Sequence, residues 1–281
     1  MSVVTTSPPD TALGPAPLHV PHKRLTRFIL PLYTFLMMLY LVSPILLMIL
    51  YSFNDVPGDR QTPRFWGFTL DWWRNLFDYP SMTQALKNSL TIAPVSAIIA
   101  TFLGTLLGLA LGRYRFKGLG GVDFLIFLAI AIPEIVLGSS LLSMFIIGKA
   151  PLGYPTILLA HIGFCIPFVA VTVRARVAGM DRSLEEAAQD LFADPMTAFF
   201  KVTLPIILPG IFAGFLLAFV LSLDDFVITN FVSGQTQTFP IWVFGASRIG
   251  IPPQVNAMGT ILFSVGLLVA IGNIVGRRRR T

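Results

Sequence analysis

The sequence predicts an all-α membrane protein with six transmembrane helices and both termini in the cytoplasm. Three observations predict this fold. First, 54% of the 281 residues are hydrophobic and only 12% are charged, about half the charged share of soluble domains. Second, several apolar stretches reach the roughly 20 residues that a helix needs to cross a bilayer core. Third, Lys and Arg gather in short groups beside those stretches, which is typical of membrane topology rather than of a nucleic-acid-binding face.

The first span is expected at 28–53, after a tail rich in Pro, Ser and Thr. Residues 1–22 read MSVVTTSPPDTALGPAPLHVPH, a composition that does not build a packed core. We therefore expect a disordered cytoplasmic tail over 1–27 and a six-helix membrane domain over 28–281. The apolar stretch is too long for a signal-peptide h-region and lacks a clear small-residue cleavage site, which favours an uncleaved span.

Five further spans follow the first, and two of them carry glycines four residues apart. In lipid such small residues let helix backbones approach closely. We expect packing within the chain, with a subunit interface as the alternative. The spans are expected at 86–112, 121–147, 155–173, 206–227 and 256–275. The glycines are Gly104, Gly108 and Gly112 in the second span and Gly272 and Gly276 in the sixth.

The basic residues orient the spans. Six spans place both termini on one side, and 14 of the 20 Lys and Arg residues lie in the tails and loops of that side. The positive-inside rule assigns this side to the cytoplasm. The segment 174–205 is then cytoplasmic, and the loop 54–85 is external. In that loop, Thr69 is expected to cap a short helix with Asp71 in its first turn. Its tryptophans Trp66, Trp72 and Trp73 are expected in the headgroup belt.

The segment 174–205 carries the signals of two short helices. Asp181 or Ser183 is expected to cap the first, where two glutamates suit the helix dipole. Asp194–Pro195 marks a turn and the start of the second, because Pro favours the first helical position. An acidic tip with small residues predicts docking onto a partner's Arg. A solvated interfacial helix without a partner is the alternative. The tip comprises Glu185, Glu186, Ala187 and Ala188.

This segment resembles the EAA loop of type I binding-protein-dependent ABC importer permeases. The stretch EEAAQDLFADPMTAFFKVTLPIILPGI (185–211) matches the family's E-A-A at Glu186, and its hydrophobic-x-L-P at Leu204 and Pro205. Ala187, Ala188, Pro209 and Gly210 complete the match. In that family the loop forms coupling helices that sit in a groove of the cytoplasmic ATPase. The resemblance therefore implies that Glu186 faces an ATPase Arg.

One position departs from the family pattern, because Phe192 stands where the family has Gly. Phe does not adopt a positive φ cheaply. We expect either that the turn is built differently or that Phe192 packs into the ATPase groove.

Further segments are similar to the spermidine/putrescine permeases, and the resemblance covers roughly 28–275. They are YSFND (51–55), ALKNSL (85–90), RYRFKG (113–118), PEIVLG (133–138), AHIGFCIPFVAVTVRAR (160–176), LSLDDFVITNFVSG (221–234) and NAMGT (256–260). The resemblance implies a type I ABC importer transmembrane domain over about 84–275, in a multi-pass protein of the prokaryotic inner membrane.

The partners implied by this family are a cytoplasmic ABC ATPase dimer, a second homologous permease and an extracytoplasmic solute-binding protein. The chain contains no G-x-x-x-x-G-K-[ST] motif, so a separate chain is expected to hydrolyse ATP. We expect no cofactor in this chain, with ATP and Mg bound by the partner ATPase, and no nucleic-acid partner.

Three carboxylates are candidates for the cargo path. In a continuous third span, Glu134 would lie roughly 20 Å from the inner end. A charge there costs at least about 2.5–3.5 kcal/mol, which favours a functional role over a hydrogen-bonded or protonated structural Glu. Pro133 beside it is expected to kink the helix. Asp224 and Asp225 are expected near the outer end of the fifth span, as a cation-attracting vestibule or as a wet helix end. Phe226, Phe231 and Trp242 supply aromatic faces for a cation.

Other function classes have weaker support. His161 and Cys165 share one helix face, and we expect His161 to make an interhelical hydrogen bond rather than to ligate a metal. An intramembrane enzyme would use Glu134, His161 and Asp224, yet no H-E-x-x-H or G-x-S-x-G motif is present. We therefore expect no catalytic residues. An ion-coupled secondary transporter is the remaining alternative, and it leaves the segment 174–205 unexplained.

Overall fold

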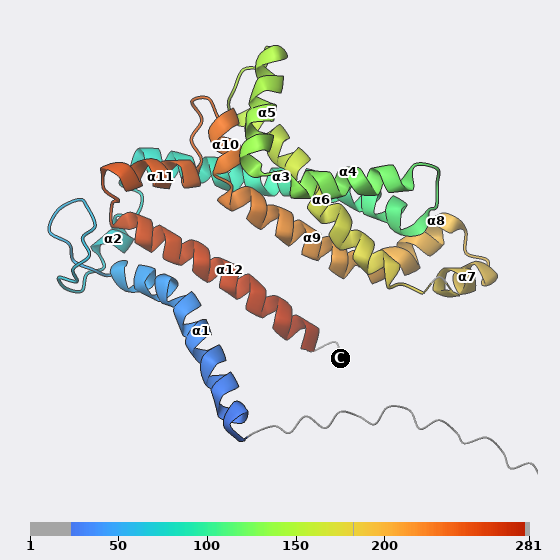
Figure 1. The fold of residues 1–281 in the computed structure, drawn as a ribbon, viewed down its shortest axis with the longest axis horizontal. Helices are drawn as coiled ribbons and strands as arrows, with labels where there is room; N and C mark the ends of the chain where they lie inside the picture. Colours follow the sequence, from blue (N-terminus) through green and yellow to red (C-terminus); the bar gives the residue numbers. More distant parts are fainter. Residues whose placement is uncertain (1–23, 182, 279–281) are drawn as a thin grey trace, which may run out of the picture. The chain divides into compact units, whose positions relative to one another are not determined.

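The computed structural model describes residues 24–181 and 183–278, and in them every extended element is a helix (Figure 1). The helices are α1 (Arg24–Tyr51), α2 (Asp71–Arg74), α3 (Pro80–Arg113), α4 (Leu119–Ala131), α5 (Glu134–Ile147), α6 (Tyr154–Ala178), α7 (Ser183–Asp190), α8 (Pro195–Ala198), the π-helical turn η1 (Phe199–Thr203), α9 (Leu204–Asp224), α10 (Val227–Val232), α11 (Phe239–Ile249) and α12 (Gln254–Arg278). Of the disordered tail expected over 1–27, residues 1–23 lie outside the described residues, and the expectation is wrong from Arg24 onward, where α1 begins.

The chain divides into two compact units. The first contains α1 and α12 from Gly259 onward. A Cβ at Gly259 would stand 2.7 Å from the Met48 sulfur, so the two helices touch there. At Gly272, by contrast, a Cβ would meet nothing within 4 Å. The packing expected there is absent within this unit, and Gly276 lies outside the side chains that the structure describes.

The second unit, residues 52–258, has its core between α3 and α6. The glycines of α3 meet a row of valines on α6. A Cβ at Gly104 would lie 2.6 Å from Val169, and one at Gly112 would lie 2.7 Å from Val177. The glycine stripe is therefore a packing face within the chain, as the sequence predicts. The residue numbers of the contacting pairs increase together along both helices, so α3 and α6 run parallel.

Helix α9 packs against this pair in the opposite direction. A Cβ at Gly210 would meet Arg176, and one at Gly214 would meet Val169. These relative directions agree with the expected alternation of the second, fourth and fifth spans. The ends of α3 and α6, the helix α7 and the start of α9 consequently share one end of the unit. That this end faces the cytoplasm stays a prediction from the basic residues.

The third span is broken, and the expectation of one helix over 121–147 is wrong. Helices α4 and α5 meet at 104° across Ile132 and Pro133. Pro133 has no N–H to donate and forces the preceding residue into an extended conformation. Ile132 accordingly has ψ 129°. Glu134 begins a new helix, so its depth in the membrane does not follow from a continuous rise.

The second helix of the segment 174–205 is not a separate element. It continues without a break through η1 into α9, giving one apolar helix from Pro195 to Asp224. The backbone N–H of Leu204 donates to the carbonyl oxygen of Phe199, a π-helical step just before Pro205. That step shifts the hydrogen-bond register where the missing N–H of Pro205 would interrupt an α-helix.

Four described helices are long and apolar enough to cross a membrane, or five if α4 and α5 count as one broken span. In α12 the apolar stretch Gln254–Leu268 is shorter than a span, so the sixth span stays a prediction. Two helices were not expected from the sequence. They are α10 and α11, and both are far shorter than a span.

The loop before α3 is pinned by its tryptophans. Trp72 Nε1 donates to the carbonyl oxygen of Asn54 at 2.7 Å, and Trp73 Nε1 donates to that of Ser52 at 3.2 Å. Thr69 Oγ1 accepts from the N–H of Asp71 at 3.1 Å, at the start of the single-turn helix α2. The helix is thus present where the sequence places it, but its N-cap residue is Leu70 and not the expected Thr69. The indoles of Trp72 and Trp73 are half-buried in the loop.

Candidate functional site

Helix α7 and the turn after it form the first candidate site. The Asp181 carboxylate accepts from the N–H of Ser183 at 3.0 Å, and this bond lowers the pKa of Asp181. Asp194 accepts from Thr197 Oγ1 at 2.5 Å and from Thr197 N–H at 3.2 Å, which lowers the pKa of Asp194. Both carboxylates act as helix caps, and Pro195 occupies the first turn after Asp194 as the sequence predicts.

Phe192 ends α7 in the left-handed conformation, with φ 61°. The N–H of Phe192 donates to Gln189 O at 2.9 Å and the N–H of Ala193 to Ala188 O at 3.1 Å. This pair of bonds is the Schellman motif, which glycine usually completes. Phe192 therefore adopts the positive φ that is costly for Phe, and packing of its ring into an ATPase groove stays a prediction. The Phe192 side chain is 99% exposed, so its strained backbone presents a bare aromatic ring.

The two glutamates of the loop have different surroundings. Glu185 forms an ion pair with Arg113 at the end of α3 and accepts a hydrogen bond from Thr203 Oγ1 in η1. Its side chain is only 14% exposed. Glu185 therefore ties α7 to two other helices of this chain. Glu186 is exposed and available to a partner.

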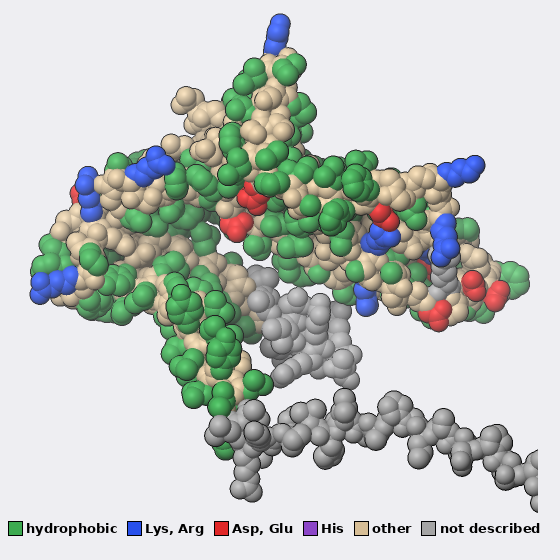
Figure 2. Space-filling view, viewed as in Figure 1, with side chains coloured by type: hydrophobic (Ala, Val, Ile, Leu, Met, Phe, Trp, Pro, Cys, Tyr) green, Lys and Arg blue, Asp and Glu red, His purple; other side chains and the backbone are tan. Residues whose placement is uncertain are grey.

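The other residues of the loop also differ in their exposure. Ala187 is exposed and Ala188 half-buried. Leu204 packs on the core, and Pro205 is exposed. A cavity of about 560 Å³ opens beside α7 and α8, and Figure 2 shows acidic side chains gathered over α7. The cavity is lined by Arg113, Tyr114, Glu185, Glu186, Gln189, Pro195, Met196, Ala198, Phe199 and Thr203.

A second candidate site lies where two helices break. Glu134 is the first residue of α5 and Asp224 the last of α9, and both are exposed. Their charges are within interaction range of one another, and Figure 2 shows acidic side chains close together near the foot of α5. The breaks thus bring together Glu134 and Asp224, which are 90 residues apart in sequence.

Asp225 is held in a buried polar network. Its Oδ2 accepts from Thr229 N–H at 2.8 Å and lies 3.2 Å from His161 Nε2. His161 Nδ1 is 2.7 Å from Ser222 Oγ, which in turn is 2.8 Å from Ser96 Oγ. The expected interhelical hydrogen bond of His161 is present. The expectation of a wet helix end does not apply to Asp225, which is 7% exposed and accepts from the N–H groups of Ile228 and Thr229 at the start of α10.

The order Ser222, His161, Asp225 has the connectivity of a hydrolase triad, yet its members are packed as structure. All three are buried, Ser222 shares its hydroxyl with Ser96, and Asp225 is engaged by the backbone of α10. A nucleophile needs an accessible oxygen beside a base. Three or more His, Cys, Asp or Glu side chains grouped for a metal ion do not occur among the described residues.

The aromatic residues expected beside the carboxylates are spread over different places. Phe226 packs on Phe244 with ring centroids 4.5 Å apart. Phe231 packs over Gly138 of α5. Trp242 donates from Nε1 to Ser81 Oγ at 3.0 Å and lines a separate cavity. The structure therefore places Glu134 near Asp224, whereas Trp242 lies in a separate place.

Two ion pairs were missed by sequence reasoning. Arg113 with Glu185 and Arg174 with Asp123 both link helix ends at the same end of the unit. Asp123 could have been noticed in the sequence, because it is an acidic residue at the start of a predicted span. Its pairing with Arg174, however, requires the packing of α4 against α6, which the sequence does not show.

Comparison with known proteins identifies the family. Residues 104–278 match the binding-protein-dependent transport system inner membrane component family. The chain belongs to this family. It is therefore an inner-membrane component of a transport system, as the resemblance of its EAA loop implied.

Curated relatives match over most of the chain. The spermidine/putrescine transport system permease protein PotC of Haemophilus influenzae is 38% identical over 248 residues, covering 88% of this chain and 95% of that protein. PotC of Escherichia coli is 39% identical, covering 86% of this chain and 91% of its own. The putrescine transport system permease protein PotI of Escherichia coli is 41% identical, covering 82% and 84%.

Solved structures share the fold at low identity. A bacterial ABC transporter involved in the import of the acidic polysaccharide alginate superposes with a TM-score of 0.65 at 16% identity, over 93% of this chain and 99% of that one. The MetNI methionine ABC transporter in an inward-facing conformation gives 0.57 at 20% identity, over 70% and 93%. The fold is that of ABC importer membrane subunits.

Proposed function

We propose that this chain is the pore-forming permease subunit of an ATP-driven ABC importer for polyamines such as spermidine and putrescine. The observation that carries the proposal is its 38–41% identity to polyamine permeases over more than four fifths of the chain. A separate ATPase dimer supplies ATP and Mg chemistry, a second homologous permease completes the pore, and an extracytoplasmic protein delivers the solute.

The loop around α7 is proposed to receive the ATPase. Glu186 is exposed on α7, and Phe192 offers a fully exposed ring two residues beyond the end of the helix. The ion pair of Glu185 with Arg113 and its bond to Thr203 hold this loop against α3 and η1. A displacement of α7 by the ATPase is therefore transmitted to two long apolar helices without a flexible linker.

The cargo path is proposed to pass the two exposed carboxylates at the helix breaks. A polyamine carries several ammonium groups, and each needs counter-charge in a low-dielectric pore while remaining free to leave. Glu134 and Asp224 supply two such charges from different helices. Asp225, whose carboxylate is engaged by His161 and Thr229, contributes by fixing the position of the break.

The docking role of α7 is tested by Glu186→Arg. Reversal of one partner of an interfacial charge pair places like charges together, which costs several kcal/mol. We expect normal amounts of the variant in the membrane, loss of the ATPase on co-purification and loss of putrescine uptake. The control is Asp78→Arg, the same reversal on an exposed residue of the external loop. Full uptake and normal ATPase recovery with Glu186→Arg would exclude this role.

A further inference from the structure

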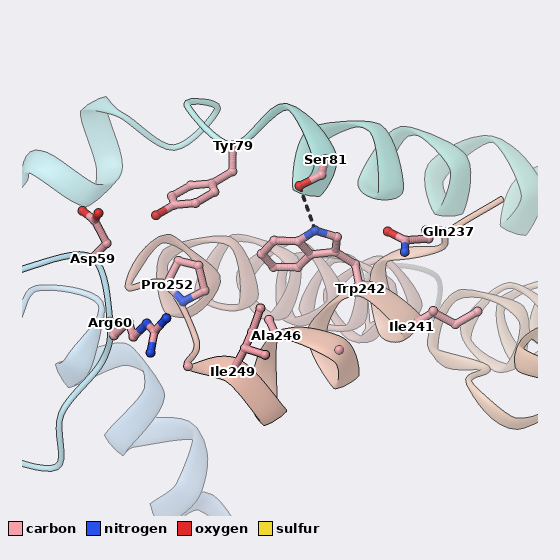
Figure 3. Close-up of a pocket in the computed structure, with 12 residues that line it drawn as sticks. Asp59, Arg60, Tyr79, Ser81, Gln237, Ile241, Trp242, Ala246, Ile249 and Pro252 are labelled. Atoms are coloured by element: carbon pink, nitrogen blue, oxygen red, sulfur yellow. Dashed lines mark hydrogen bonds between the residues drawn. The ribbon is translucent and has the colours of Figure 1, made fainter. Parts of the chain in front are cut away.

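A separate cavity of about 610 Å³ opens between the start of α3, the helix α11 and the loop before α2. Figure 3 shows the side chains that line it, among them the rings of Tyr79 and Trp242. Its volume lies in the range of small-molecule sites, which combine an apolar lining with a few convergent polar groups. The lining comprises Asp59, Arg60, Tyr79, Ser81, Gln237, Ile241, Trp242, Gly245, Ala246, Ile249, Gly250 and Pro252.

The walls of this cavity are fixed by direct contacts. The N–H of Gln61 donates to the carbonyl oxygen of Ile251 at 2.8 Å, which joins the loop to the turn after α11. Gly250 has φ 113°, and a Cβ there would stand 2.5 Å from Cδ of Arg60. The hydrogen bond from Trp242 to Ser81 fixes the plane of the indole. The cavity is thus formed by the chain itself before any ligand arrives.

The chemistry of the opening suits a cation. Asp59 lies beside the ring of Tyr79 (Figure 3), and burial together with the Asp59 charge raises the pKa of Tyr79. Asp59 makes no salt bridge within the described part of the chain. Aromatic faces attract ammonium groups through their quadrupole, and Trp does so most strongly. One carboxylate and two aromatic faces therefore converge on a single opening.

Arg60 is the one group of the lining that opposes a cation. Figure 3 shows its guanidinium beside Pro252 and Ile249, on the other side of the cavity from Trp242 and Ser81. Its stem packs against Gly250. The lining thus carries one charge of each sign, Asp59 and Arg60, and each should have an opposite and measurable effect on any charged ligand.

We propose that this cavity binds one ammonium end of a linear organic cation, with Asp59 as counter-charge and Tyr79 and Trp242 as aromatic walls. The site is distinct from the carboxylates Glu134 and Asp224 at the helix breaks. The choice of a linear amine rests on the proposed polyamine cargo. On the expected topology, the cavity lies on the external side, where it receives cargo before the cargo reaches the breaks.

The test is direct binding of radiolabelled putrescine to the assembled importer in nanodiscs, without the solute-binding protein. Asp59→Asn should weaken binding about fivefold, the effect of one nearby charge at partial exposure. Arg60→Gln should tighten it about twofold. Arg64→Gln is the control, because Arg64 stacks over Trp66 outside the cavity. Repeating the series with Glu134→Gln should leave these ratios unchanged.

Each outcome decides the proposal. Weaker binding with Asp59→Asn and tighter binding with Arg60→Gln support a cation site. Opposite signs, or equal affinities in all variants, overturn it. Putrescine uptake by the same importer with its solute-binding protein is measured in parallel. Normal uptake with unchanged affinities refutes the cavity alone, whereas absent uptake refutes the polyamine function and leaves the signs of the binding series to decide the cavity.

Discussion

Replacing Phe192 with Gly is expected to relax the free loop and to weaken its association with the ATPase. Phe192 holds φ 61° at the end of α7, a conformation that costs a residue with a Cβ about 1–2 kcal/mol. Gly removes that cost but gains chain entropy in the unfolded state, about 0.5–1 kcal/mol. The free loop should therefore gain stability by about 0–1.5 kcal/mol.

The ring itself should account for the larger effect. It is 99% exposed in this chain, and full burial of a Phe side chain contributes about 1.5–3 kcal/mol. If an ATPase groove covers the ring, Phe192→Gly should raise the dissociation constant about tenfold to a hundredfold. The assay is titration of the purified ATPase onto the permease in nanodiscs.

Phe192→Ala is the matched variant, since it removes the ring while keeping a Cβ at positive φ. Both variants should lose ATPase affinity to a similar extent, with Ala the less stable loop. Leu191→Ala, at the 82% exposed neighbour, controls for general loss of apolar surface. Unchanged affinity in both Phe192 variants would refute the reasoning, and the turn would then merely tolerate Phe.

Three further substitutions test the packing and the two sites. Gly108→Val should destabilise the protein by about 1–3 kcal/mol in thermal unfolding, because its Cβ would stand 2.7 Å from the carbonyl oxygen of Ala170. Unchanged stability would contradict the close approach of α3 and α6. Glu185→Gln should lower the free energy of unfolding by about 2 kcal/mol, less than the roughly 3–5 kcal/mol for breaking a fully buried ion pair, because Arg113 is 22% exposed. The variant should also reduce transport-coupled ATP hydrolysis. If the double variant with Arg113→Gln does not recover stability, the ion pair does not account for the loss. Asp225→Asn should lower the amount of protein in the membrane without slowing uptake per molecule; slow uptake at normal levels would instead assign Asp225 to the cargo path.

The sequence predicts most of this fold because apolar length and glycine spacing are local signals. Spans appear where 20 or more apolar residues occur together, and Gly104 and Gly108 mark a close helix contact because only small side chains permit one. The short helix α7 and its Asp181 cap also follow from residues within one turn of each other.

The errors have a common cause, which is competition between local signals and packing. Pro133 indicated a kink, but the span breaks by 104° there, with α4 packed on α6 and α5 packed on α10. Asp194 and Pro195 indicated the start of a separate short helix, whereas η1 allows that helix to continue from Pro195 to Asp224.

The candidate sites show the same limit. Adjacent acids such as Asp224 and Asp225 look alike in sequence, and only the turn between α9 and α10 makes one exposed and the other buried. Glu185 and Glu186 differ for the same reason, because Arg113 and Thr203 lie 72 and 18 residues away in the chain but meet only one of them. Pairings across such separations are set by tertiary contacts, which local patterns do not encode.

The central claim is tested most directly by uptake of radiolabelled putrescine into proteoliposomes that contain this chain, its second permease and the ATPase, with the solute-binding protein added outside. The account predicts uptake that requires enclosed ATP and that is lost with Glu186→Arg at normal membrane levels. It also predicts slower uptake with Glu134→Gln, normalised to inserted protein. Uptake that proceeds without ATP under a sodium or proton gradient would contradict the account and favour an ion-coupled transporter.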